Sequence, residues 1–133
     1  CSNHHKLTNV ISFAVSAEYP PFEYIEKGVL KGFDIELARL VAQELNKEAV
    51  FQNMNFSCIL AATHSGHVDA AISTITITPE RQKSFDFSRS YYVESLAMIY
   101  PDHKSLADKA QLYGKKIACQ LGTTMEIWLK RHA

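Results

Sequence analysis

Arg81 is the residue whose type and setting best suit the binding of a small acid. It ends the segment Thr-Ile-Thr-Pro-Glu-Arg (76–81), which follows a short apolar run at 69–72. A guanidinium can donate two parallel charge-assisted hydrogen bonds to a carboxylate, each worth about 1.5–3 kcal/mol. Thr74, Ile75 and Thr76 can add backbone N–H and C=O groups and the Thr76 hydroxyl. The alternative is a solvated arginine on an exposed helix.

Aromatic rings and a threonine pair offer further contacts for a small ligand. A cationic group over the ring of Tyr19 or Phe56 gains about 0.5–2 kcal/mol, although residue type alone favours a core position for both rings. Thr123 and Thr124 follow an expected strand and precede an expected helix, where backbone N–H groups can bind an anion. A simple helix N-cap explains at least one of these threonines. Gln120 is a further candidate for contact with the ligand.

The three cysteines are too few and too scattered for a disulfide framework, and their spacing does not fit a zinc site. Cys58 and Cys119 lie in apolar patterns, so both are predicted to be small buried residues. Cys1 precedes a polar stretch at 2–6 and looks like the first residue of a mature bacterial lipoprotein whose signal peptide has been removed. Residues 1–8 would then be a flexible tether and Cys1 the site of lipid attachment. A chain boundary that happens to fall at a cysteine is the alternative.

Composition argues against several other functions. The chain has 133 residues, 47% hydrophobic and 21% charged, with a formal net charge of zero. This balance is ordinary for a soluble globular protein and provides no basic field for nucleic acid or an anionic membrane. Its apolar runs are too short to span a bilayer. His64 and His67 are interpreted as surface residues, and no catalytic Ser/His/Asp set or metal cluster stands out, so no metal, cofactor or enzyme activity is predicted.

The elements that would position these residues alternate between strands and helices. A capping aspartate at Asp34, a terminating Asn46 and the pair Thr78-Pro79 mark helix ends. The alternation predicts an α/β fold with a mainly parallel sheet. The expected strands are 10–15, 49–52, 69–72, 96–100 and 116–120, with a hairpin at 23–25 and 29–30. The expected helices are 34–45, 57–65, one starting at 78–81, a short one within 104–112 and one from 125 onward.

Six segments in the same order resemble periplasmic polar-amino-acid-binding proteins, the family 3 solute-binding proteins of ABC importers, similar to the arginine-, histidine- and glutamine-binding proteins. They cover roughly residues 10–130, so they are more specific together than singly. The segments are Tyr-Pro-Pro-Phe-Glu-Tyr (19–24), Gly-Phe-Asp-Ile-Glu-Leu-Ala (32–38), Asp-Ala-Ala-Ile (69–72), Thr-Ile-Thr-Pro-Glu-Arg (76–81), Phe-Asp-Phe-Ser (85–88) with Tyr-Tyr (91–92), and Gln-Leu-Gly-Thr-Thr (120–124).

The resemblance implies a type II periplasmic-binding-protein-like fold, in which two α/β lobes with mainly parallel sheets hold a ligand between them. Residues 9–90 would be most of lobe 1, residues 91–95 the first hinge crossing, and residues 96–133 the beginning of lobe 2. The second lobe would be incomplete, because about half of a family member is present. Its uncovered apolar surface could make the truncated chain self-associate, which a clean monomer in light scattering would disprove.

The resemblance also assigns roles to the candidate residues. It implies that Arg81 binds the ligand carboxylate with help from the 74–76 segment, and that Tyr19 and Phe56 pack against the ligand side chain. Ser16 stands where many relatives have an aspartate on the pocket face, so side-chain specificity is in doubt, although nearby Glu18 could compensate. Cys58 replaces a glycine of the family pattern. The acid that grips the ligand ammonium would lie beyond residue 133.

The implied function is capture of a free L-amino acid by lobe closure and its delivery to an ABC permease in the inner membrane. Arginine or another basic amino acid is the leading ligand, followed by glutamine or histidine. The protein would work in the periplasm or at the cell surface, anchored by lipid on Cys1. A cyclohexadienyl dehydratase-like enzyme and the extracellular sensing module of a receptor are the alternatives. Since binding energy is spread over both lobes, the 133-residue chain is predicted to bind amino acids weakly or not at all.

Overall fold

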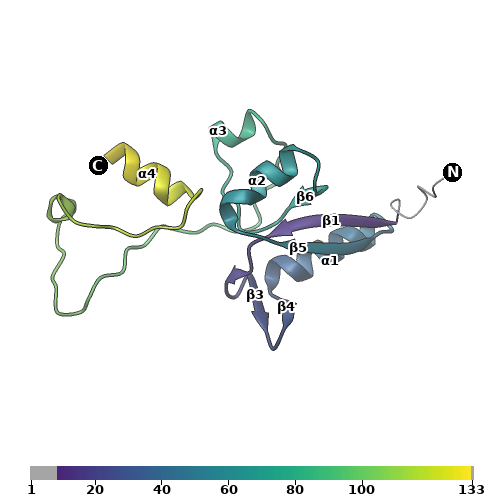
Figure 1. Cartoon of the computed structure of the whole chain (residues 1–133), viewed down its shortest axis with the longest axis horizontal. Coiled ribbons are helices and arrows are strands. Elements are labelled where there is room, and N and C mark those ends of the chain that lie inside the picture. Colours follow the sequence, from purple (N-terminus) through teal and green to yellow (C-terminus); the bar gives the residue numbers. More distant parts are fainter. Residues whose placement is uncertain (1–8, 133) are drawn as a thin grey trace. The chain divides into compact units, whose positions relative to one another are not determined.

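The computed structural model describes residues 9–132 and divides at Asp86 and Phe87 into two compact units (Figure 1). The elements of the first unit are β1 (Val10–Val15), β2 (Glu18–Tyr19), β3 (Glu23–Glu26), β4 (Val29–Lys31), α1 (Phe33–Glu44), β5 (Glu48–Asn53), α2 (Phe56–His64), β6 (Ala70–Ala71) and α3 (Pro79–Gln82). Those of the second unit are the 3₁₀ turn η1 (Lys109–Leu112) and α4 (Thr124–His132).

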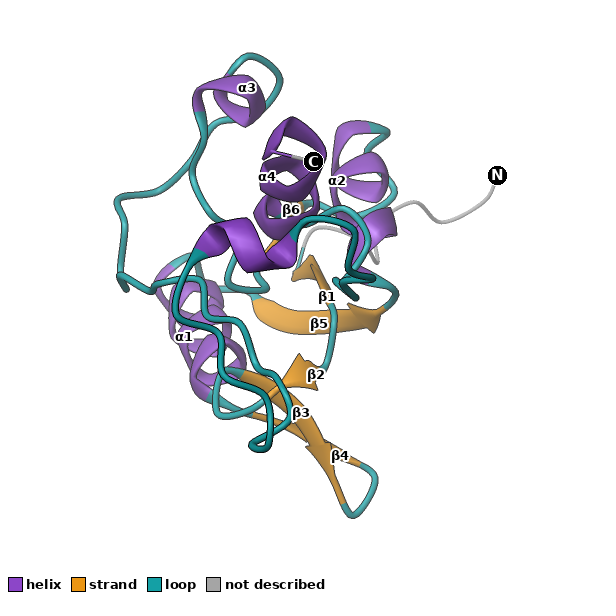
Figure 2. Ribbon diagram, turned by 90° about the vertical axis from the view of Figure 1, so that its left-hand side faces the viewer, coloured by secondary structure: helices purple, strands orange, loops and turns teal. Residues whose placement is uncertain are grey.

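A three-stranded parallel sheet of order β5-β1-β6 forms the centre of the first unit. Phe13 of β1 stacks on Phe51 of β5 with ring centroids 5.8 Å apart, and Arg39 of α1 lies over the Phe51 ring. The next residue of β1, Ala14, packs in a buried cluster with Ile59 of α2. Because successive strand residues point to opposite faces, α1 and α2 cover opposite faces of the sheet (Figure 2). The predicted α/β fold with a parallel sheet is confirmed here.

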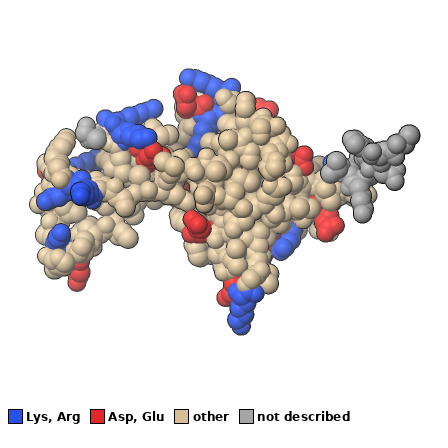
Figure 3. All heavy atoms as spheres, in the orientation of Figure 1, with Lys and Arg blue, Asp and Glu red and all other residues tan. Residues whose placement is uncertain are grey.

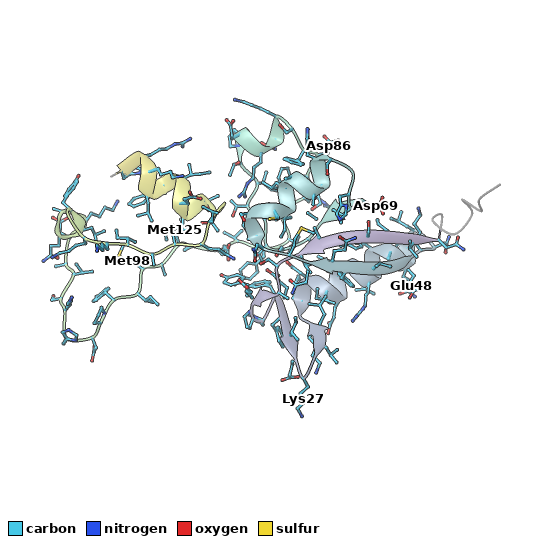
Figure 4. All side chains as sticks on the ribbon, viewed as in Figure 1. Lys27, Glu48, Asp69, Asp86, Met98 and Met125 are labelled. Atoms are coloured by element: carbon cyan, nitrogen blue, oxygen red, sulfur yellow. The ribbon has the colours of Figure 1, made fainter. Side chains whose placement is uncertain are left out.

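A small antiparallel sheet of order β2-β3-β4 stands beside α1. Its outer hairpin turns at Lys27 and Gly28, whose φ angles are 50° and 76°. Two consecutive positive φ angles are typical of a type I′ turn, which matches the twist of the flanking strands. Figure 4 shows Lys27 at the tip of this hairpin. The hairpin was predicted, whereas the short strand β2 was not, because prolines follow it directly.

The ends of α1 show one correct and one wrong prediction. Asn46 ends the helix as expected: its φ is 56°, and the N–H of Lys47 donates to the Ala42 carbonyl at 2.8 Å. Asp34, however, is not the N-cap, because that position belongs to Gly32. The Asp34 side chain is instead fully buried and accepts a hydrogen bond from the backbone N–H of Thr74.

The second unit contains helical segments but neither of the predicted strands. Residues 96–100 and 116–120 are extended and exposed, and no strand pairs with them in the described part of the chain. A parallel strand needs a neighbour to satisfy its N–H and C=O groups, so an apolar run alone does not make one. The short helix expected within 104–112 is the single turn η1, which Asp108 caps.

Both internal cysteines are exposed, which contradicts the prediction that they are buried. Cys58 precedes Ile59, which takes the core-facing position in α2, so the cysteine faces away from the sheet. Cys119 lies in the extended segment that has no strand neighbour. The interpretation of Cys1 and of the 1–8 tether concerns residues outside the described range.

The described residues contain neither a membrane-spanning helix nor a metal-binding cluster. None of the helices in the described part of the chain combines the length and hydrophobicity that a bilayer crossing needs. Within residues 9–132, histidine, cysteine, aspartate and glutamate form no group of three or more that is placed to hold a metal ion. On the visible face of the first unit, basic and acidic side chains are interspersed rather than gathered by sign (Figure 3).

Candidate functional site

The predicted site residues of the first unit follow the carboxyl ends of the parallel strands. Ser16 follows β1, Phe56 follows β5, and the segment 74–76 follows β6. The chain passes from β1 to β5 on one side of β1 and then returns to β6 on its other side. Open α/β sheets bind ligands at such a reversal, outside the carboxyl ends of the strands. The backbone N–H of Ser16 donates to Ser73 Oγ at 3.0 Å and so joins two of these strand ends.

Arg81 is buried at this edge, with 8% of its surface exposed. The residue sits in α3, where Thr78 is the N-cap and accepts a hydrogen bond from the Arg81 backbone N–H at 3.1 Å, as the Thr-Pro pattern predicts. The guanidinium Nη1 donates to the Thr76 carbonyl at 2.8 Å. Burial lowers the pKa of Arg81, although a guanidinium keeps its charge in proteins. A positive charge is therefore held against the 74–76 segment.

Thr74 begins that segment in an unusual backbone conformation, with a φ of 48°. A threonine seldom adopts positive φ, because its branched side chain crowds the backbone. The conformation is held from outside, since Asp34 Oδ2 accepts the Thr74 N–H at 2.8 Å. Ile75 packs against the buried cluster around Ile59, and Thr76 is exposed. Ile75 thus fixes the segment to the core, while Thr76 remains open to a ligand.

Glu23 and Ser73 complete this arrangement and were not predicted as site residues. Glu23 is 1% exposed, and its Oε1 accepts a hydrogen bond from Ser73 Oγ at 3.0 Å and one from Thr74 Oγ1 at 3.3 Å. Burial, together with a side-chain hydrogen bond to Asp34 and the charge of Asp34, raises the pKa of Glu23 to about 9. The hairpin pattern gave no signal of this, because Glu23 reads as one polar residue in a short strand.

The other predicted residues of the first unit differ in exposure and in their partners. They are Tyr19, Phe56 and Ser16. Tyr19 is 46% exposed and stacks on Phe22 with centroids 5.6 Å apart, so one part of its ring is supported and another is accessible. Phe56 packs against the buried cluster and is only partly accessible. Ser16 is 3% exposed, and its Oγ has no hydrogen-bond partner within residues 9–132. Glu18, the suggested substitute acid, is exposed in β2.

The predicted site residues of the second unit lie together at the start of α4. The hydroxyl of Thr123 donates to the Gln120 carbonyl at 2.7 Å and accepts the backbone N–H of Glu126 at 3.3 Å, so Thr123 acts as a helix cap. Thr124 is the first residue of α4. The carboxylate of Glu126 also accepts the N–H of Gly122 at 2.7 Å. The capping role accounts for Thr123. A ligand role for Gln120, Thr123 and Thr124 stays a prediction.

Comparison with known proteins identifies the family. The family model for bacterial extracellular solute-binding proteins, family 3, matches residues 11–127, so the chain belongs to this family. The arginine-binding extracellular protein ArtP of Bacillus subtilis is 38% identical over 111 residues, covering 84% of this chain and 44% of its own length. A probable histidine-binding protein of Campylobacter jejuni is 34% identical over 126 residues, covering 94% and 49%. The chain spans about half the length of these relatives.

Solved structures agree with this assignment. An ancestral arginine-binding protein bound to arginine superposes with a TM-score of 0.62 at 39% identity, covering 63% of this chain and 38% of that one. An arginine-bound mutant of domain 1 from TmArgBP gives 0.62 at 33% identity, covering 63% and 66%. An ancestral cyclohexadienyl dehydratase gives 0.60 at 30% identity, covering 63% and 35%. The family fold, of which this chain is a part, therefore carries both binding proteins and an enzyme.

Proposed function

We propose that this chain is the first part of the substrate-binding component of an amino-acid ABC importer. It would capture a free L-amino acid, with arginine or another basic amino acid as the leading ligand and glutamine or histidine next. The observation that carries the proposal is the buried Arg81 guanidinium, held at the Thr76 carbonyl on the carboxyl edge of the sheet. The names of the relatives, which specify arginine and histidine, support this ligand class.

The ligand carboxylate would bind to Arg81 and to the polar groups of Thr74 and Thr76. A buried carboxylate needs such partners, because losing water without replacement hydrogen bonds is costly. The accessible ring of Tyr19 offers a surface for a cationic side chain. The Ser16 hydroxyl, which has no hydrogen-bond partner within residues 9–132, could accept one hydrogen bond from it. The arginine-bound domain 1 of TmArgBP supports placing the principal contacts in the first unit.

The second unit would close over the ligand through Gln120, Thr123 and Thr124. In this proposal residues 9–90, 91–95 and 96–133 correspond to lobe 1, the first hinge crossing and the start of lobe 2. The closed form would be recognised by the permease, and lipid on Cys1 would keep the protein at a membrane in the periplasm or at the cell surface. A ligand drives such closure only by binding the closed form more tightly than the open one.

A thermal-shift screen of the complete protein against the twenty amino acids tests the ligand class. A ligand present at about 100 times its Kd stabilises the folded protein by about 2.7 kcal/mol, which raises the Tm measurably. We expect arginine or another basic amino acid to give the largest rise. Agmatine is the matched control, because it keeps the guanidinium of arginine and lacks the carboxylate, so it should give a much smaller rise.

An enzyme on the same fold is the second candidate, favoured by the likeness to the ancestral dehydratase. Turnover of prephenate or arogenate by the complete protein would favour that candidate. A Tm that no amino acid changes would contradict the importer proposal.

A further inference from the structure

Two buried carboxyl groups lie directly beneath the segment that we assign to ligand binding. Glu23 of β3 is 1% exposed and Asp34 of α1 is 0% exposed. The backbone joins them closely, since the Asp34 N–H donates to the carbonyl of Phe22 at 2.9 Å. Both side chains bond to Thr74: Asp34 accepts its N–H at 2.8 Å, and Glu23 accepts its hydroxyl at 3.3 Å. The positive φ of Thr74 is therefore held by this acid pair.

The charges on the surrounding elements do not neutralise Glu23. Within the described residues, Glu18 of β2 and Glu36 of α1 are exposed acids, Lys31 of β4 forms an ion pair with Glu26 at 2.7 Å, and Arg39 of α1 lies over an aromatic ring. Arg81 of α3 donates to the Thr76 carbonyl. The Glu23 carboxyl group accepts hydrogen bonds from Ser73 and Thr74, and burial together with the charge of Asp34 acts on it and raises its pKa.

Two buried carboxyl groups that both bond to Thr74 favour a proton on one of them. Two ionised carboxylates repel each other, and a hydrogen bond between them exists only when one carries a proton. Glu23 Oε1 accepts from Ser73 and Thr74, whereas Oε2 is buried and receives no hydrogen bond from a donor within residues 9–132. Oε2 is therefore the atom of Glu23 that can carry a proton without competing with the donors Ser73 and Thr74.

We propose that Glu23 is a protonated positioning residue that, as the neutral partner of the buried Asp34, holds Ser73 and Thr74 in the shape needed for amino-acid capture. Removing the proton would leave two negative charges in a dry site, and their repulsion would release Thr74 and weaken ligand binding. The ligand-binding half of this inference rests on the proposed function. The protonation of Glu23 is independent of the proposed function.

Linkage gives the direction of the pH effect. The pKa of Glu23 is raised from 4.5 to about 9, so the folded chain keeps a proton that the unfolded chain releases above 4.5. The folded state binds more protons throughout this range, and the free energy of unfolding therefore falls as pH rises from 4.5 to about 9. Above that range the contribution of Glu23 is constant.

The protonation half is tested on the complete protein without ligand. A pH of about 7 lies well above the ordinary pKa of glutamate. At this pH the infrared spectrum should still contain the carbonyl band of a protonated carboxylic acid. This band should disappear in Glu23→Gln and remain in Glu26→Gln, a control on the same strand whose carboxylate is exposed. Denaturant unfolding should show that Glu23→Gln loses less stability than the wild type between about pH 5 and about pH 9. A band that survives in Glu23→Gln, or parallel stability profiles, would overturn the inference.

The ligand-binding half is tested by calorimetry with L-arginine. The amide of Glu23→Gln can accept from Ser73 through Oε1 and donate to Asp34 through Nε2 at every pH, so we expect affinity within about threefold of the wild type near neutral pH. Above about pH 9 the wild type should lose about tenfold in affinity per pH unit relative to Glu23→Gln. Titration of arginine itself cancels in this comparison, because both proteins receive the same ligand.

The outcomes separate the two proposals. If the wild type binds arginine and both proteins have the same pH profile, the positioning role of Glu23 is wrong and the proposed function stands. If the infrared and stability results are as expected but neither arginine nor another amino acid binds, the proton pair stands, while the proposed function and the ligand-binding half both fail. Glu23→Ala, which removes acceptor and donor together, should weaken arginine binding at all pH values, and unchanged binding would contradict the inference.

Discussion

A buried arginine is the residue on which the candidate site depends. Arg81 is 8% exposed, and burial of a charged group costs free energy unless the group is paired or hydrogen-bonded. The Thr76 carbonyl provides one acceptor, at 2.8 Å. A ligand carboxylate would add two charge-assisted hydrogen bonds in the planar geometry that a guanidinium favours. The proposed anionic ligand requires a buried guanidinium at this position, and the Thr76 carbonyl accepts one of its hydrogen bonds.

In the complete protein, we expect Arg81→Ala to lower arginine affinity by about 3 kcal/mol or more, because the ligand carboxylate would lose its buried partner. Isothermal calorimetry measures this directly. Lys83→Ala is the matched control, since Lys83 follows α3 as an exposed cation, paired with Glu80 at 3.2 Å, and its loss should leave affinity unchanged. A loss below about tenfold, or about 1.4 kcal/mol, would remove Arg81 from the site.

At the scale of elements, the entry to α1 is set by a close backbone approach. Gly32 has a φ of 129° and precedes the helix. A methyl group on Gly32 would overlap the carbonyl oxygen of Phe22. That carbonyl also accepts the N–H of Asp34, so the same approach fixes one member of the buried acid pair. The glycine therefore positions α1, the hairpin and the ligand segment together.

Gly32→Ala is expected to destabilise the protein by about 2 kcal/mol or more, because the added methyl group clashes with backbone that cannot move away. Urea unfolding of the complete protein measures the loss. Gly28→Ala is the control: Gly28 also has positive φ, 76°, but a methyl group there would meet nothing within 4 Å. Its cost should be about 1–2 kcal/mol, from the backbone conformation alone. Equal losses in the two variants would show that the overlap at Gly32 is relieved easily.

Elements with a strong local signal were predictable from the sequence. The apolar run of β1, the helical spacing of α1 and the Thr78-Pro79 start of α3 each depend on a few adjacent residues, and the structure has all three. Asp34 shows the limit of this approach. An aspartate at a helix start is usually a cap, but its partner Thr74 is 40 residues away, and only the folded chain brings them together.

The two missing strands and the exposure of Cys119 have the same explanation. Residues 96–100 and 116–120 have apolar patterns, yet a strand exists only beside another strand. Local pattern does not reveal whether that neighbour is present. Within the candidate site, motif and resemblance pointed to the 74–76 segment and Arg81, and these stay predictions as ligand contacts. They gave no reason to single out Glu23, because its raised pKa follows from burial near Asp34 in the folded chain.

At the scale of the whole molecule, capture would divide the ligand contacts between two units. In the proposal the first unit contributes Arg81, Thr74 and Tyr19, and the second contributes the start of α4. A ligand between two such surfaces gains the full binding energy only when both are complete. The chain spans 44% of the length of ArtP.

We therefore expect the 133-residue chain to bind L-arginine more weakly than the micromolar range, or not measurably, and the complete protein to bind it more tightly. In the proposed mechanism the shorter chain keeps Arg81 but has fewer of the contacts that would favour the closed form. Calorimetry on both proteins under the same conditions measures it. Arg81→Ala in the shorter chain is the control, since any residual binding should disappear with that side chain. Micromolar affinity of the 133-residue chain would show that the first unit supplies nearly all of the binding energy and that closure contributes little.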